Sequence, residues 1–157
     1  MFKNLKLFLI VAFWGILSIE GLSAANPKRE FRSTWFTTVW NLDWPKSSGS
    51  TAQKAELTTY LDQLKAMNLT SVCFQVRSLC DAMYKSSYEP WSSALTGTRG
   101  SNPGWDPLAF VVEECHKRGM ECYAWFNPFR WSTGTTYNTS YDQQWRNKGW
   151  ILTYGSY

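Results

Sequence analysis

The sequence predicts an α/β fold in which three parallel strands alternate with two helices. Strand-like segments occupy residues 31–40, 71–77 and 121–127, and the segments between them show apolar residues at helical spacing. A β-α-β-α-β order of this kind requires parallel strands joined by right-handed crossovers.

The first helix is predicted over residues 51–67. Ser50, followed by Gln53 three residues later, forms the signature of a capping box, which marks a helix N-terminus. One face of this helix carries apolar residues at helical spacing, namely Leu57, Tyr60, Leu61, Leu64 and Met67. We expect this face to pack against the sheet.

The second helix is predicted to begin at Asp106-Pro107, a capping residue followed by proline in the first turn. Gly119 is a stop signal at its other end. The residues on its apolar face are Leu108, Val111, Val112 and Cys115. Like the first helix, this one has an apolar face and recognisable terminal signals.

The polar residues of the second helix are expected to have structural roles. Lys117 and Arg118 lie in the last turn, where the helix dipole favours positive charge. His116 lies in the same turn and is interpreted as structural or solvated, and Glu113 and Glu114 are interpreted as solvated.

The loops that follow the strands are long, whereas those that follow the helices are short. Residues 41–49 and 78–105 connect strands to helices, and only a few residues lead from each helix to the next strand. In parallel α/β folds, the loops at the carboxyl ends of the strands build the functional site. The length of these loops therefore points to a site at that edge.

The alternation of side chains along a strand assigns the residues of the predicted sheet to two faces. The more apolar face of the second strand, with Val72, Phe74 and Val76, is expected to contact the helices. The opposite face carries Cys73, Gln75, Arg77, Tyr123, Trp125 and Asn127. This second face becomes polar toward the carboxyl ends of the strands, so it is expected to face a barrel interior or a cleft.

Residues 1–25 have the features of a signal peptide. Lys3 and Lys6 precede an apolar stretch at residues 7–17, and small residues follow at 23–25. The alternative is a membrane anchor, but the stretch is shorter than the ~20 residues that a membrane span requires. We expect a secreted or periplasmic protein with no stable membrane association after cleavage, and a domain at residues 26–157.

Composition and cysteine usage exclude several classes of function. The formal net charge is +4 and no run of Lys or Arg occurs, which argues against nucleic acid as a partner. A single histidine and the absence of a CxxC motif argue against a metal site, and no cofactor is expected. Cys73 falls in a strand and Cys115 in a helix, where thiols behave as small apolar groups. One disulfide remains possible, and the spacing does not choose it.

Three segments resemble the glycosyl-hydrolase-like family ten, a group of secreted bacterial proteins in the glycoside hydrolase TIM-barrel superfamily. They are WFTTVWNLDWP (35–45), FQVRSLCDAMYKSSYEPWSSALTG (74–97) and DPLAFVVEECHKRGMECYAWFNPFR (106–130). The resemblance implies a (β/α)₈ barrel and a carbohydrate ligand. Tyr123 departs from the histidine expected before Ala-Trp, which weakens a role in proton transfer at this position.

A TIM barrel requires roughly 250 residues, whereas this chain has 157. We therefore expect about three β/α units, the N-terminal portion of an incomplete barrel domain, arising from a truncated gene or an incomplete reading frame. The later strand-end aspartate motif of the family is expected beyond this portion.

Glycoside hydrolysis generally uses two carboxylates, one as acid and the other as nucleophile or base. Asp81 and Glu89 are the candidate catalytic residues, because they follow the second strand on the expected site side. For Glu89 the alternative is a loop salt bridge. Asp43 is interpreted as organising the turn before Pro45, and Asp106 as a helix cap.

The candidate substrate-binding residues lie at the same edge. Arg77 and Arg130 could hold carboxylates or tie down a loop, and Asn127 could bind a hydroxyl or cap its strand. Gln75, on the same face of the sheet as Arg77, is also a candidate for substrate binding. The tryptophans that offer flat faces to sugar rings are Trp40, Trp44, Trp91 and Trp131, about half of which are expected to face the cleft.

These observations predict a fragment of a secreted glycoside hydrolase-like protein that acts on glycosidic bonds of a poly- or oligosaccharide and is inactive alone. Whether the chain is an enzyme stays open. The first alternative is a carbohydrate-binding protein without catalysis. The second is a chain that does not fold stably, because an open three-stranded sheet leaves unpaired edges.

Overall fold

The computed structural model describes residues 30–131 and 140–150, so the predicted signal peptide lies outside the described residues. The chain divides into two units, Met1–Glu30 and Phe31–Tyr157, and all described elements belong to the second. These elements are β1 (Ser33–Phe36), the 3-10 helix η2 (Val39–Asn41), α2 (Ser50–Ala66), β2 (Ser71–Arg77), α3 (Ser93–Thr96), α4 (Pro107–Lys117), β3 (Glu121–Phe126) and α5 (Ser140–Asn147).

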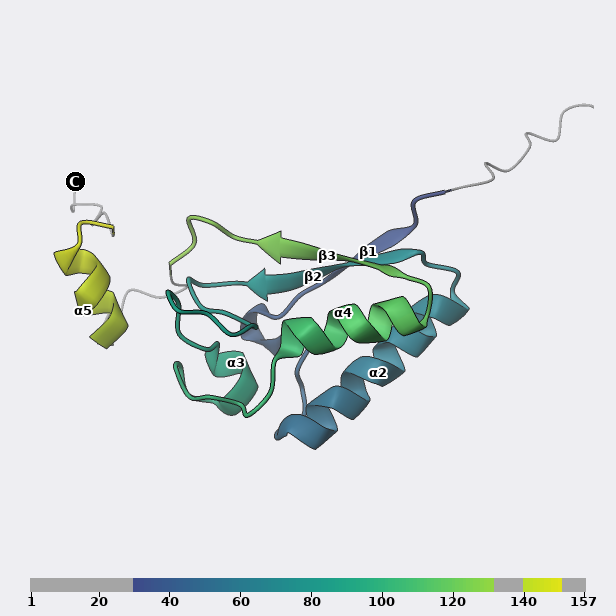
Figure 1. Cartoon of the computed structure of the whole chain (residues 1–157), viewed down its shortest axis with the longest axis horizontal. Helices are drawn as coiled ribbons and strands as arrows, with labels where there is room; N and C mark the ends of the chain where they lie inside the picture. Colours follow the sequence, from purple (N-terminus) through teal and green to yellow (C-terminus); the bar gives the residue numbers. More distant parts are fainter. Residues whose placement is uncertain (1–29, 132–139, 151–157) are drawn as a thin grey trace, which may run out of the picture. The chain divides into compact units, whose positions relative to one another are not determined.

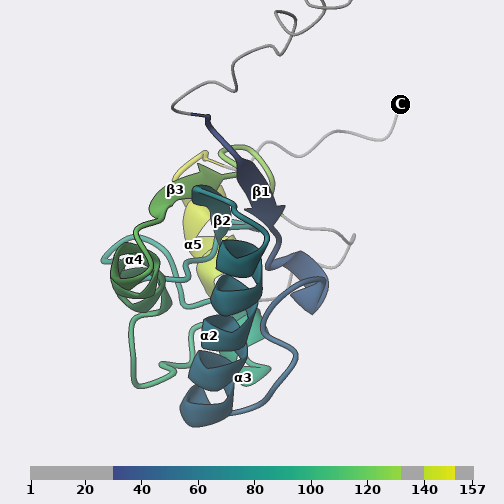
Figure 2. The same ribbon diagram turned by 90° about the vertical axis from the view of Figure 1, so that its right-hand side faces the viewer.

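The three strands form one parallel sheet in the order β1-β2-β3, and α2 and α4 cover one of its faces (Figures 1 and 2). The predicted parallel β-α-β-α-β arrangement is confirmed. Cys73 of β2 pairs with Trp35 of β1 and Tyr123 of β3, so all three side chains lie on the face away from the helices. The sheet is compatible with part of a barrel.

The core lies between the sheet and the two helices, as the strand alternation predicts. Val72, Phe74 and Val76 are completely buried on the helix side of β2. They pack with residues of α2 and α4 that are also completely buried, namely Leu57, Leu61, Val111 and Cys115. Burying one such side chain stabilises the fold by roughly 1.5–3 kcal/mol, so these contacts fix both helices on the sheet.

The N-terminus of α2 differs from the prediction. Gly49, with φ 83°, precedes the helix and no side chain caps it. Gln53 does not complete a capping box, because its Nε2 donates instead to the carbonyls of Ser47 and Leu95. The predicted apolar face is correct for most of its length, but Met67 lies beyond the helix and is 60% exposed.

Helix α4 begins and ends as predicted. The Asp106 side chain accepts a hydrogen bond from the Ala109 amide, and Gly119, with φ 62°, follows the end of the helix. The expectation that Glu114 is solvated is wrong. The residue is buried, and its carboxylate forms ion pairs with Lys117 at 2.8 Å and Arg118 at 2.6 Å. These hydrogen bonds lower the pKa of Glu114 below its ordinary value.

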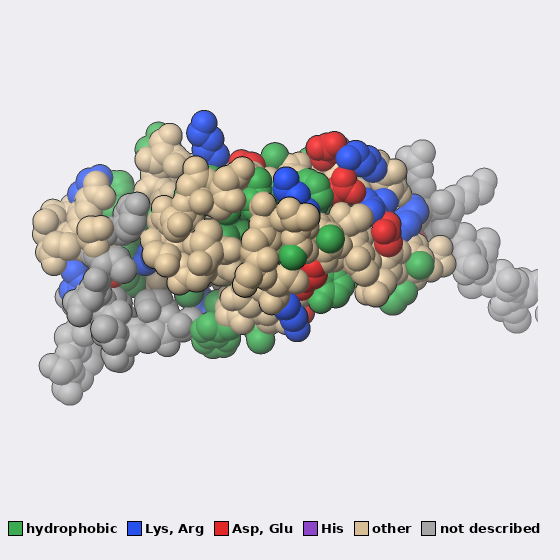
Figure 3. All heavy atoms as spheres, turned by 90° about the horizontal axis from the view of Figure 1, so that it is seen from below, with side chains coloured by type: hydrophobic (Ala, Val, Ile, Leu, Met, Phe, Trp, Pro, Cys, Tyr) green, Lys and Arg blue, Asp and Glu red, His purple; other side chains and the backbone are tan. Residues whose placement is uncertain are grey.

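The helix-covered face carries acidic and basic side chains intermingled rather than separated by sign (Figure 3). One ion pair joins the two helices there, between Arg118 and Asp62 at 2.7 Å. Neither sign of charge dominates the described residues of this face.

Strand β1 is shorter than the predicted segment 31–40, since it ends at Phe36. The backbone then leaves the sheet because side chains capture its amides. Asp43 Oδ2 accepts from the Thr37 amide at 2.7 Å, and Gln75 Oε1 accepts from the amides of Thr38 and Val39 at 2.9 Å each. The expected role of Asp43 in organising this turn is thus confirmed.

Candidate functional site

The carboxyl edge of the sheet is organised by Arg77, the last residue of β2. Its Nε donates to Glu89 Oε1 at 2.6 Å, and Nη2 lies 2.5 Å from the same oxygen. Its Nη1 donates to the carbonyls of Asn127 and Pro128 at 2.6 and 3.0 Å. One guanidinium therefore joins the end of β2, the long loop that follows it and the end of β3.

Arg77 and Glu89 form a largely buried ion pair, since their side chains are only 15% and 14% exposed. Burial opposes the charge on Arg77, but its hydrogen bond with Glu89 raises the pKa of the guanidinium above its ordinary value. Arg77 Nη2 also donates to the Cys80 sulfur at 2.9 Å. Burial raises the pKa of the Cys80 thiol despite this contact. Arg77 thus ties together the loop and the two strand ends, and Glu89 forms a salt bridge within this network.

Asn127 lies beside Arg77, as the predicted convergence of strand ends requires. Its backbone N–H donates to the Arg77 carbonyl at 3.0 Å, and its side-chain Oδ1 accepts from Trp125 Nε1 at 2.9 Å. Its Nδ2 is 3.4 Å from the carbonyl of Ser78, which is a long contact. The side chain therefore helps to fix the end of β3, and its Nδ2 group can still donate a hydrogen bond.

Gln75, a predicted substrate-binding residue, contacts the backbone of the turn that follows β1. The residue is completely buried, and its Oε1 holds the backbone of Thr38 and Val39. Its Nε2 has no hydrogen-bond partner among the described residues. Gln75 thus positions the turn after β1 from within the core.

Asp81, the other predicted catalytic carboxylate, lies in the turn that follows β2. It is 4% exposed, and its Oδ1 accepts from Ser78 Oγ at 3.1 Å and from the Leu79 amide at 2.9 Å. One carboxylate oxygen, Oδ1, therefore closes the turn that follows β2. Asp106 caps α4 as expected and also accepts from the Lys85 amide.

Trp40 and Arg130 meet above this edge. The Arg130 guanidinium lies 5.6 Å from the centre of the Trp40 ring, a cation–π distance, and the tryptophan is 63% exposed. Trp40 and Asn41 both have left-handed backbone angles, φ 55° and 54°. Such angles cost non-glycine residues on the order of 1–3 kcal/mol each and cluster at binding and active sites. The strained turn holds the Trp40 ring outward.

The three other candidate tryptophans are less available. Trp44 is completely buried, packs against Phe74 and donates from Nε1 to the Gln53 carbonyl at 3.0 Å, so its ring has no exposed face in this structure. Trp91 is half-buried and packs against the core. Trp131 is half-buried, and its ring packs against Trp145 and the Arg99 guanidinium.

Arg99 is a feature that the sequence reasoning missed. Its guanidinium lies 5.2 Å from the ring centre of Trp131 and 5.8 Å from that of Trp145 in α5, and its Nη1 is 3.5 Å from Asp142. Its Nη2 donates to the Cys80 carbonyl at 2.8 Å. No sequence signal separates this arginine from a solvated loop residue, because its partners are far away along the chain.

Aromatic side chains also cover the sheet face opposite the helices. Trp35 packs edge to face on Trp125 at 4.7 Å, and Phe31 packs likewise on Tyr123 at 5.6 Å. Trp35 is 63% and Tyr123 44% exposed. The hydrogen bond of Tyr123 with Glu121 raises the pKa of the phenol. Strand alternation predicted that Tyr123 and Trp125 share this face, but it did not single out Trp35.

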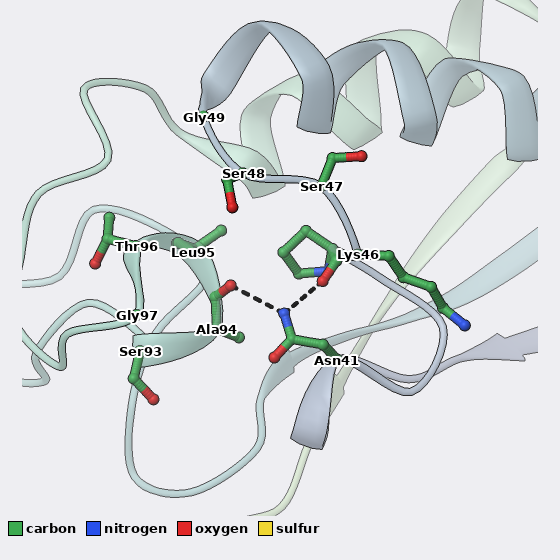
Figure 4. Close-up of a pocket in the computed structure, with 11 residues that line it drawn as sticks. Asn41, Lys46, Ser47, Ser48, Gly49, Ser93, Ala94, Leu95, Thr96 and Gly97 are labelled. Carbon is green, nitrogen blue, oxygen red and sulfur yellow. Dashed lines mark hydrogen bonds between the residues drawn. The ribbon is translucent and has the colours of Figure 1, made fainter.

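A cavity of about 500 Å³ lies between the loop that precedes α2 and helix α3 (Figure 4). Asn41 forms part of its wall, and its Nδ2 donates to the carbonyls of Pro45 and Ala94. Hydroxyl groups line much of the remainder, those of Ser47, Ser48, Ser93 and Thr96. Since Asn41 directly follows Trp40, this one strained turn shapes both the cavity wall and the exposed aromatic face.

Residues 30–131 and 140–150 contain no group of three or more His, Cys, Asp or Glu side chains placed to hold a metal ion. They also contain no helix that combines the length and the apolar character of a membrane span.

The arrangement defines a class of protein. A parallel β/α sheet with long loops, aromatic rings and a fixed polar network at its carboxyl edge is the arrangement that α/β enzymes and binding proteins use for small polar ligands. The profile of the family described as "Glycosyl hydrolase-like 10" matches residues 30–156. The chain belongs to this family, as the sequence motifs indicate.

Two relatives place the chain more closely. It is 38% identical over 161 residues to "Glycosyl hydrolase YngK" of Bacillus subtilis (strain 168), an alignment that covers 98% of this chain and 32% of that protein. It is 41% identical over 113 residues to "Glycosyl hydrolase DigH" of Escherichia coli (strain K12), covering 66% of this chain and 26% of that protein. The chain thus spans about a third or less of the length of these relatives.

Proposed function

We propose that this chain forms the first β/α units of a (β/α)₈ barrel and contributes the part of a carbohydrate-binding cleft around Trp40. The family and the relatives named glycosyl hydrolases support a carbohydrate ligand. The parallel sheet with its helices on one face is compatible with the beginning of such a barrel. The whole protein would then act on glycosidic bonds.

The observation that carries the proposal is the outward position of Trp40. The backbone adopts an unfavourable left-handed angle at a bulky residue, and the ring is left 63% exposed beside the Arg130 guanidinium. A core tryptophan in this fold, Trp44, is buried instead. A flat aromatic surface next to a cation suits a sugar ring, whose axial C–H groups pack on the aromatic face while its hydroxyls accept hydrogen bonds from the cation.

The carboxylates at this edge support binding more than catalysis by this chain. Glu89 is held by Arg77, Asp81 closes its own turn, and Asp43 and Asp106 hold backbone amides. Glycosidases need one carboxylate as an acid and a second as nucleophile or base. The engagement of each of these four groups favours the second candidate, a carbohydrate-binding role without turnover, for the chain taken by itself.

The test is a binding and hydrolysis assay on the purified chain. Titration with a panel of bacterial cell-wall and plant oligosaccharides should quench tryptophan fluorescence saturably for at least one sugar class. No release of reducing sugar is expected under the same conditions. Hydrolysis that disappears in Asp81→Asn or Glu89→Gln would assign catalysis to this chain and contradict the proposal, as would the absence of binding to every sugar in the panel.

We also propose export with removal of the first 24 or 25 residues, supported by Lys3, Lys6 and the apolar stretch at 7–17. N-terminal sequencing of the chain recovered from outside the cytoplasm should begin at residue 25 or 26. A product that still begins at Met1 would overturn this.

A further inference from the structure

The cavity beside α3 has walls from two segments that are far apart in the sequence. The loop that precedes α2 forms one wall, and α3 with the glycine that follows it forms the other (Figure 4). The wall residues are Pro45, Lys46, Ser47, Ser48 and Gly49 on the first side and Ser93, Ala94, Leu95, Thr96 and Gly97 on the second. The volume of about 500 Å³ lies within the range of small-molecule sites, ~300–1,000 Å³.

Two carboxamide groups fix the distance between these walls. Asn41 Nδ2 donates to the carbonyls of Pro45 and Ala94, one from each wall. Gln53 Nε2 likewise donates to one carbonyl from each wall, at 3.1 and 2.8 Å. Each nitrogen uses both of its N–H groups in this way. The protein's own hydrogen bonds therefore preform the cavity, which lowers the entropic cost of binding a ligand there.

The lining suits an uncharged ligand that carries hydroxyl groups. Lys46 is the one charged residue among those that line the cavity, and its ammonium group extends away from it (Figure 4). The Ser48 hydroxyl points from the loop toward α3 (Figure 4), and a hydroxyl both donates and accepts hydrogen bonds. Pro45 and Leu95 add apolar carbon to the lining. A sugar ring presents the same combination of hydroxyl groups and C–H surface.

We propose that this cavity is a second carbohydrate subsite, which binds one uncharged sugar ring of the ligand whose neighbouring ring packs on Trp40. Asn41 connects the two places, because it lines the cavity and directly follows Trp40 in the same left-handed turn. The inference rests on the proposed carbohydrate ligand and extends it. Binding should depend on the size and hydroxyl groups of a single sugar as well as on the aromatic face.

The main test uses the wild-type chain, isotopically labelled for NMR. Glucose, galactose, mannose and N-acetylglucosamine are titrated separately, with glucuronic acid as the anionic comparison. At least one uncharged sugar should shift the backbone amide signals of Ser48, Gly49 and Gly97 saturably. Gly119 and Gly149 have similar left-handed angles but do not line the cavity, so their signals should not move. Shifts centred away from the lining residues, or a response to glucuronic acid alone, would rule out this site.

Two serine variants locate the effect. Ser48→Phe, at an exposed position, fills the cavity with a ring, so it should abolish the monosaccharide shifts and weaken oligosaccharide binding by about tenfold. Ser101→Phe, at an exposed position in the loop between α3 and α4, is the matched control and should bind as wild type does. Circular dichroism checks that both variants are folded. If Ser48→Phe does not fold, the wild-type shifts decide alone.

The cavity inference and the proposed function fail separately. If Trp40→Ala weakens oligosaccharide binding while folded Ser48→Phe binds as wild type does, the cavity inference is wrong and the proposed function stands. The same holds if oligosaccharides bind but no uncharged monosaccharide shifts the lining residues. If sugars of neither size bind, both proposals are wrong.

Discussion

The Arg77 guanidinium and the Glu89 carboxylate lie 2.5 Å apart at the carboxyl edge of the sheet, joining the end of β2 to the loop twelve residues further along. The same guanidinium holds the backbone of Asn127 and Pro128 beyond β3. Two residues that the sequence marks as candidates for catalysis and binding thus connect three segments at this edge.

Replacing Arg77 should destabilise the chain strongly. Arg77→Met leaves the Glu89 carboxylate half-buried without its cation and removes the bonds to the β3 end, which should lower the free energy of unfolding by about 3 kcal/mol. Arg130→Met is the matched control, because Arg130 is exposed and makes a cation–π contact with Trp40, so the loss of stability should be below about 1 kcal/mol. Urea unfolding followed by tryptophan fluorescence measures both, and equal losses would contradict this assignment.

Gln75 should prove to be a structural residue. Gln75→Leu removes the oxygen that accepts from two buried amides, those of Thr38 and Val39, and should cost about 3 kcal/mol of unfolding free energy. Gln63→Leu, on the exposed side of α2, should change stability by less than about 0.5 kcal/mol. A Gln75→Leu variant that is as stable as wild type but has lost oligosaccharide binding would contradict this prediction and support a substrate contact at Gln75.

Glu114 should contribute stability that depends on pH. Its pKa is lowered in the folded chain, so its contribution is fully present above the unfolded-state value of about 4.3 and is lost as pH falls through the folded value. Glu114→Gln should cost about 2 kcal/mol near neutral pH, and the gap from wild type should narrow below about pH 4.

Glu113→Gln is the control for this profile. Glu113 makes the same 2.8 Å contact with Lys117, but its side chain is 64% exposed against 11% for Glu114. An exposed pair of this kind contributes at most about 0.5 kcal/mol. Unfolding measured between pH 3 and 7 should separate the two variants, and overlapping profiles would argue against the buried network.

The sequence predicted the layout of the fold because its signals are local. The spacing of Leu57 and Leu61 and the Asp106-Pro107 start each lie within one helix, and the alternation of Val72 and Phe74 lies within one strand. The end of β1 could not be predicted in this way. It is set by Gln75, which takes the Thr38 and Val39 amides out of the strand from 36 and 37 residues away.

The sequence predicts where a candidate site should lie but not the contacts within it. Strand order and loop length favour the carboxyl edge, and the family motifs suggest a ligand. The division of roles depends on contacts between distant segments. Trp40 and Trp44 are four residues apart in one loop with similar neighbours, yet one is 63% exposed and the other is buried beneath the loop.

The most direct test of the carbohydrate-binding proposal compares Trp40 with an equally exposed tryptophan elsewhere. Trp40 is 63% exposed at the carboxyl edge, and Trp150, after α5, is 65% exposed beside Lys148. The measurement is the dissociation constant of the oligosaccharide that binds the wild-type chain. Trp40→Ala should weaken binding by about tenfold, or about 1.4 kcal/mol, while Trp150→Ala should leave it unchanged. Equal affinity of wild type and Trp40→Ala would contradict a binding surface at this edge.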